Sequence, residues 1–138
     1  MPEFSNLEVG QVVAESEFPI TRDSLVRYAG ASGDFNPIHY REDVAKQVGL
    51  PGVLAHGMLT MGLSIQPVIA WLEGKGEVVD YSVRFTKPVV VPPQGEAVVG
   101  VVATVAALDE ENSRVRVDLT TTFEGNTVLG KAQAWVKF

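Results

Sequence analysis

The side chains best suited to acid–base chemistry lie within one short stretch of the chain. Asp34, Asn36 and His39 surround Pro37, so a carboxylate, an amide and an imidazole fall within six residues. Imidazole titrates nearest neutral pH among side chains and can give or take a proton without a large pKa shift. Because Pro37 fixes its own φ and disfavours helical geometry at Asn36, the segment predicts a turn that brings the two titratable groups together.

A second stretch supplies a donor for negative charge. Ala55-His56-Gly57-Met58 opens an apolar run that continues to Leu72, which indicates a buried helix beginning at Gly57. The first N–H groups of a helix are unpaired and carry partial positive charge, so they stabilise a developing oxyanion. Together the two stretches contain what is needed to move a proton beside a carbonyl.

Composition restricts the class of protein. The 138 residues carry a net charge of −6 with a pI near 4.8, which argues against a nucleic-acid binder. There is no cysteine, so disulfides and thiolate chemistry are excluded. The opening Met-Pro-Glu-Phe-Ser lacks a basic region followed by an apolar run, so we expect no export signal and a cytoplasmic location. Residues 1–138 match the length of a single domain.

The first half of the chain reads as one strand followed by helices. We expect an entry strand over 7–20 that Pro19 ends, and a helix capped by Thr21 that stops between Gly30 and Gly33. After the turn, residues 40–48 predict a short helix closed by Gly49. The helix over 57–72 has apolar residues on every side, which predicts that other structure wraps it; Pro67 is expected to kink or break it.

The second half predicts strands throughout. Alternation of apolar and polar residues indicates half-buried strands over 79–86 and 114–123, and the last strand is expected over 127–138. Residues 96–108 are apolar on both faces, which predicts a central strand covered on two sides. The expected fold class is α+β, with one long helix against a curved antiparallel sheet.

Several of these residues carry a resemblance to a known family. Tyr28-Ala-Gly-Ala-Ser-Gly-Asp34-Phe-Asn-Pro-Ile-His39, with Ala45 six residues on, resembles the signature of the R-specific enoyl-thioester hydratases and dehydratases, the MaoC-like group of the hot-dog fold. Ala55-His56-Gly57-Met58 and Val83-Arg-Phe-Thr86 are similar to the same group. Within it, the chain looks most like the beta subunit of the mycobacterial-type (3R)-hydroxyacyl-carrier-protein dehydratase.

The resemblance implies a fold, a reaction and roles for individual residues. The fold is a central helix wrapped by a curved sheet, with a short helical overhang that carries the catalytic loop. The reaction is reversible syn hydration and dehydration of trans-2-enoyl and (3R)-hydroxyacyl thioesters in fatty-acid metabolism, on CoA or acyl carrier protein. Asp34 and His39 are the implied catalytic pair, the Gly57 N–H the implied oxyanion donor, and Asn36 the implied support of the loop or holder of a water. No metal or redox cofactor is implied.

The same resemblance implies an assembly. The expected partners are the acyl-thioester substrate, an acyl carrier protein, and a second hot-dog subunit in a homodimer or heterodimer with the site at the interface. No nucleic acid and no membrane insertion are expected. Acyl chain length, the choice of carrier, the physiological direction and the member of the pair that meets the C2 proton stay open.

Three further residues have two interpretations each. His56 binds substrate or bonds to nearby backbone, and Met58 lines an acyl tunnel or fills the core. Arg84, with Lys87, contacts a pantetheine phosphate or an acidic carrier protein, or lies on a solvated strand face. Two other functions also remain open. One is a hot-dog thioesterase, and the other is a non-catalytic module that binds acyl thioesters.

Overall fold

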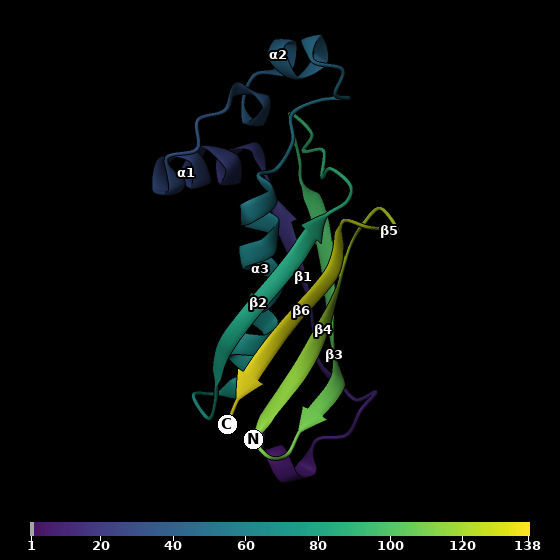
Figure 1. Ribbon diagram of the computed structural model, residues 1–138. Helices are drawn as coiled ribbons and strands as arrows, with labels where there is room; N and C mark the ends of the chain where they lie inside the picture. The colour runs from purple at the N-terminus through teal and green to yellow at the C-terminus, as the bar shows by residue number, and fades with distance from the viewer. Residues whose placement is uncertain (1) are drawn as a thin grey trace.

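A curved antiparallel sheet lies against one long helix in the computed structural model, which describes residues 2–138 (Figure 1). The strands run in the order β1-β3-β4-β6-β2, and the short β5 pairs with β4. Register shifts interrupt three of the strand pairs, and such bulges bend a sheet. The predicted α+β class is confirmed. The strands are β1 (Val12–Ile20), β2 (Glu77–Phe85), β3 (Ala97–Asp109), β4 (Arg114–Phe123), β5 (Asn126–Thr127) and β6 (Leu129–Lys137).

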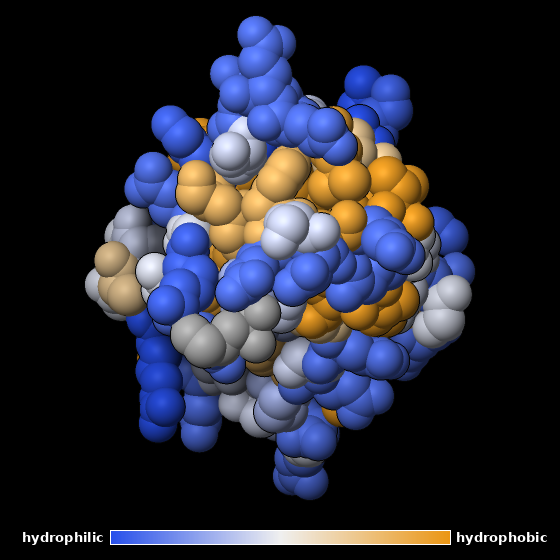
Figure 2. Space-filling model, turned by 90° about the horizontal axis from the view of Figure 1, so that it is seen from below, coloured by the Kyte–Doolittle hydropathy of each residue, from blue (hydrophilic) through white to orange (hydrophobic). Residues whose placement is uncertain are grey.

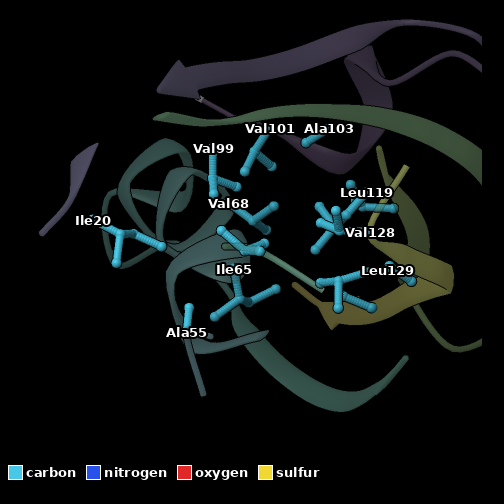
Figure 3. Packing of buried hydrophobic residues seen from close by; sticks show 14 of the residues in the cluster. Ile20, Ala55, Ile65, Val68, Val99, Val101, Ala103, Leu119, Val128 and Leu129 are labelled. Carbon is cyan, nitrogen blue, oxygen red and sulfur yellow. The ribbon is translucent and has the colours of Figure 1, made fainter. Parts of the chain in front are cut away.

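The core forms where helix α3 (Gly57–Leu72) meets the concave face of the sheet. Ile65 and Val68 of the helix point toward Val99, Val101 and Leu119 of the strands (Figure 3). Each such side chain, when fully buried, contributes on the order of 1.5–3 kcal/mol relative to exposure. This packing fixes the helix along the sheet and so fixes the position of its first turn.

The prediction that other structure surrounds α3 on every side is wrong in part. Met58 and Ile69 are 58% and 48% exposed, so one face of the helix is open. The apolar character of that face therefore does not reflect burial within this chain. Pro67 is buried inside the helix, which continues to Leu72 without ending there.

Two helices form an overhang at the N-terminal end of α3 (Figure 1). Helix α1 (Arg22–Ser32) begins with a capping box between Thr21 and Ser24, as the sequence predicted for its cap. It ends at Gly33, whose φ of 76° favours glycine. A 3-10 turn (Pro37–His39) and helix α2 (Glu42–Gln47) follow.

Arg22 joins the overhang to the rest of the molecule. Its guanidinium lies 2.6 Å from the Glu42 carboxylate of α2, and its Nε donates to the Val91 carbonyl at 2.9 Å. The two helices are therefore tied to each other and to the loop after β2.

Several strand predictions needed correction. The first strand begins at Val12 and not at Leu7, because residues 9–10 form a turn in which Gly10 has a φ of 94°. Pro19 does not end this strand but lies within it, opposite Val98. A proline is tolerated there because β1 is an edge strand. Strand β3 is buried on one face and half-exposed on the other, since only α3 covers the sheet. The predicted final strand is divided in two at Val128.

Both termini lie at the end of the molecule opposite the overhang (Figure 1). Phe138 packs there against Phe4 and Trp71, with ring centroids 6.2 and 6.1 Å away. Seen from this end, hydrophobic areas alternate with hydrophilic side chains (Figure 2). Among residues 2–138, no helix has the length and apolar character that crossing a bilayer requires.

Candidate active site

Asp34 and His39 face each other across the turn that the sequence predicted. The Asp34 Oδ2 and His39 Nε2 atoms are 3.9 Å apart, which is too long for a direct hydrogen bond. The Asp34 side chain is 50% exposed, whereas that of His39 is 10% exposed. The pair therefore combines a solvated carboxylate with an enclosed imidazole, and a small group can be held by both.

The local sequence sets this turn. The Asp34 carboxylate accepts a hydrogen bond from the Asn36 N–H at 3.1 Å, and the Asn36 side chain accepts one from the Ile38 N–H at 3.2 Å. Asn36 thus caps the 3-10 turn that Pro37 begins. Through this cap the Asn36 side chain contributes to the conformation of the loop.

The proton of His39 has a defined place. His39 Nδ1 lies 2.8 Å from the Leu54 carbonyl oxygen, which can only accept, so Nδ1 carries the hydrogen. In the neutral ring Nε2 then has a free lone pair, and this atom faces Asp34. Leu54 also donates its N–H to Ile38 at 3.1 Å, so one residue holds both the turn and the ring.

Gly57 is the first residue of α3, as predicted. The N–H groups of Leu59 and Thr60 bond to the His56 carbonyl, whereas among residues 2–138 the Gly57 N–H has no acceptor. The ring of Phe85 lies against the same glycine, and a Cβ placed there would be 2.8 Å from a ring carbon. An approaching oxygen therefore finds an unpaired donor at a place where any other residue would crowd Phe85.

Asp34, His39 and Gly57 line one cavity of about 430 Å³. Met58 lines it as well, in agreement with the tunnel interpretation of that residue. Leu54, Ala55 and Thr60, which flank the start of α3, line it too. The remaining wall comes from residues far away in the sequence: Phe85, Thr86, Lys87, Pro88, Val89, Val128 and Leu129. The cavity is therefore mainly apolar, with the acid–base pair and the helix N-terminus at one side.

His56 does not line this cavity, so the substrate-binding role considered for it is not supported. Its side chain is buried, with 1% exposure, and its ring stacks on that of His39 with centroids 3.8 Å apart and an angle of 20°. Its Nε2 lies 3.2 Å from the Asp34 backbone carbonyl. Burial lowers the pKa of His56; the bond to the Asp34 carbonyl opposes that shift and His39 adds to it.

The side chains of Asp34, His39 and His56 do not fit a metal ion well, although their ligand atoms lie within 4.8 Å of one another. A metal bound to imidazole lies in the plane of the ring. The His39 and His56 rings are stacked almost in parallel, and His56 Nε2 is already bonded to the Asp34 carbonyl. One ion cannot lie in both ring planes.

Arg84 lies outside the cavity, on the exposed side of β2. Lys87 is the cation at the cavity instead, and its ammonium group donates to the Asn126 side chain at 3.2 Å. Sequence reasoning missed Leu54 and Phe85, because a backbone carbonyl leaves no mark in a sequence and Phe85 looked like any apolar strand residue.

Comparison with known proteins agrees with this geometry. The family model described as "MaoC like domain" matches residues 3–123. An (R)-specific enoyl-CoA hydratase of Rhodospirillum rubrum is 32% identical over 135 residues, which cover 96% of this chain and 90% of the relative. A 3-hydroxyacyl-thioester dehydratase X of Mycobacterium tuberculosis is 46% identical over 74 residues, 53% of this chain.

A solved structure titled "MaoC-like dehydratase" superimposes on 99% of this chain with a TM-score of 0.94 and 37% identity. The chain spans only 42% of that protein and 25% of the mycobacterial dehydratase. The match of the family model over most of the chain nevertheless establishes the family. The chain belongs to the MaoC-like domain family, with the hot-dog fold that the sequence led us to expect.

Proposed function

We propose that this protein catalyses reversible syn addition of water to trans-2-enoyl thioesters, and the reverse dehydration of (3R)-hydroxyacyl thioesters. The observation that carries the proposal is the convergence of Asp34, the free Nε2 of His39 and the unpaired N–H of Gly57 on one cavity. The similarity to the R. rubrum hydratase along nearly the whole of both chains supports the same reaction.

Because His39 carries its hydrogen on Nδ1, we assign proton transfer to its Nε2 and orientation of the hydroxyl to Asp34. In the dehydrating direction Nε2, which has the lone pair, takes the C2 proton and the electron pair moves toward the thioester oxygen. The C3–O bond then breaks, C2=C3 forms, and the proton held at Nε2 passes to the departing hydroxyl. Asp34 accepts a hydrogen bond from that hydroxyl and orients it. Water leaves, and both side chains return to their initial states.

Gly57 stabilises the intermediate charge. The enolate-like oxygen accepts a hydrogen bond from the Gly57 N–H, at the positive end of α3. Such a donor is fixed before the reaction begins and needs no reorganisation when charge develops. The contribution of one donor of this kind is on the order of 10² to 10³ in rate.

A second cavity beside the first can hold the part of the substrate that carries the acyl group, which is the pantetheine arm. This second cavity of about 530 Å³ shares Lys87, Pro88 and Val128 with the first. We place the pantetheine arm of CoA or of an acyl carrier protein there, with Lys87 facing its phosphate.

A second subunit is part of the proposal. Strand β2 is an open edge of the sheet, and it carries Val79 and Phe85 with 45% and 56% exposure. It lies beside helix α3 (Figure 1). Met58 and Ile69 of that helix are exposed as well. An open strand edge offers unpaired backbone groups to another chain, and exposed apolar patches mark interaction sites, so we place the second subunit here. A cytoplasmic location stays a prediction.

Hydration of crotonyl-CoA tests the proposal. Loss of the ultraviolet absorbance of the enoyl band without release of free thiol is the expected result, and chiral analysis of the product should give the R isomer. Thiol release without loss of the double bond would establish a thioesterase instead. Tight binding of enoyl-CoA without either change would establish a binding module.

A further inference from the structure

His56 contacts both members of the acid–base pair, Asp34 and His39, and lies outside the cavity that they line. Its ring stacks on the His39 ring with centroids 3.8 Å apart, and its Nε2 is 3.2 Å from the Asp34 carbonyl. Tyr28 of α1 packs edge-on against the His56 ring as well, with centroids 4.7 Å apart. His56 is 1% exposed and does not line the cavity, so it does not touch substrate there.

The hydrogen bond defines the protonation of His56. A carbonyl oxygen only accepts, so Nε2 carries the hydrogen and donates it to Asp34. His56 Nδ1 is buried and has no hydrogen-bond partner among residues 2–138. A second proton on Nδ1 would leave an unpaired donor in the interior, which is costly. Burial lowers the pKa of His56, which agrees with a neutral ring.

We propose that His56 is a positioning residue that sets the spacing of Asp34 and His39 and supports the charge that His39 gains during turnover. The His56 ring holds the backbone at Asp34 through a hydrogen bond, and it holds the plane of the His39 ring by stacking on it. When His39 takes a proton, a neutral aromatic face next to it accommodates the cation, whereas a second charged ring would repel it. This inference rests on the proposed hydratase function.

Two substitutions separate the two contacts. His56→Phe keeps a ring for the stack and removes the donor, and His56→Gln keeps a donor and removes the ring. Because a displacement of about 1 Å at a reacting group can lower the rate about 10²-fold, we expect kcat to fall by roughly 10- to 100-fold in each. KM should change less than about two-fold, since His56 does not line the cavity.

Ser64→Ala is the matched control. Ser64 is a fully buried polar residue of α3, the helix that follows His56, and it lies outside the cavity lining. We expect it to lower the unfolding midpoint and leave kcat per folded molecule unchanged. If the His56 variants behave like this control, losing stability but not kcat, the positioning role is overturned.

NMR of the wild-type protein tests the inference even if the His56 variants do not fold. The chain has only two histidines, so ¹⁵N-histidine labelling gives two resolvable imidazoles, and His39→Gln assigns them. The groups that face His56 are His39, Asp34 and Tyr28. We expect His56 to show the neutral Nε2–H form at pH 6.5, the ordinary pKa of the side chain. A proton on Nδ1, or half-protonation at that pH, would contradict the inference.

The two hypotheses fail in different ways. A wild-type protein that hydrates no enoyl thioester in a series of graded chain lengths, on CoA or on acyl carrier protein, refutes the proposed function, whatever the NMR result. An active wild type with fully active His56→Phe and His56→Gln variants refutes the positioning role alone.

Discussion

The ring of Phe85 lies so close to Gly57 that a Cβ on that glycine would be 2.8 Å from the nearest ring carbon. A methyl group at the head of α3 must therefore displace Phe85, and it occupies the space through which a thioester oxygen reaches the N–H. We predict that Gly57→Ala lowers kcat/KM for crotonyl-CoA by about 10² to 10³.

Gly30→Ala is the control for this substitution. Gly30 lies inside α1 with nothing within 4 Å of an added Cβ. The Gly30→Ala variant should retain activity. Its free energy of unfolding should increase by on the order of 0.5–1 kcal/mol, because alanine is more favourable than glycine in a helix interior. Equal activity of Gly57→Ala and Gly30→Ala would exclude Gly57 as the oxyanion donor.

The acid–base pair gives the second prediction. Asp34→Asn and His39→Ala should each lower kcat by roughly 10² to 10⁴, because His39 carries the proton and the Asp34 carboxylate orients the hydroxyl that receives it. Circular dichroism should show that Asp34→Asn folds normally, since that side chain is half exposed. Rates within two-fold of wild type, measured by stopped-flow at saturating substrate, would refute the assignment.

The third prediction concerns the dependence of stability on pH. Burial lowers the pKa of His56 from its ordinary value of 6.5, while the unfolded chain keeps that value. Between the two values the unfolded state binds more protons, so stability rises with pH in that window. The contribution of His56 is complete above about pH 6.5 and is lost as the pH falls through the folded-state pKa.

Thermal unfolding between about pH 8 and pH 5 measures this effect. His56→Phe has no titrating group at the position, so its midpoint should fall less steeply with acid than that of the wild type. Parallel curves for the two proteins would show that His56 does not contribute to the pH dependence.

A buried pair of hydroxyl groups between α3 and β4 gives the fourth prediction. Thr121 donates to Ser64 at 3.0 Å, and Ser64 donates to the Thr60 carbonyl at 2.7 Å. Ser64→Ala leaves the Thr121 hydroxyl buried without its acceptor, at a cost of about 1–3 kcal/mol. Adding Thr121→Val removes that hydroxyl as well and should restore part of the loss. Urea denaturation of the single and double variants gives the coupling energy, and strict additivity would contradict the prediction.

The parts of the site that the sequence predicted are those set by neighbouring residues. Pro37 and Asn36 determine the turn between Asp34 and His39 through φ restriction and capping, both of which are local. The start of α3 at Gly57 follows equally from the apolar run after it. The resemblance to the MaoC-like group rested on these same residues and is confirmed by the family comparison.

The parts that the sequence did not predict depend on contacts between distant segments. The stack of His56 on His39 requires the loop before α3 to pass beneath the turn, and the Leu54 carbonyl is identified only by the atom that it faces. Strand β3 looked covered on both faces because apolar composition does not distinguish a face that packs within the chain from one that does not. The exposed apolar face of α3 gave the same false impression of burial.

The two sides of the cavity come from different parts of the chain. Every group given a chemical step lies before residue 58, whereas the facing wall comes from residues 85–89 and from Val128 and Leu129. Substitutions in that wall can therefore reshape the space for the acyl group while the proton-transfer machinery stays intact. Evolution within this architecture can change which acyl chain is accepted independently of how the water is added.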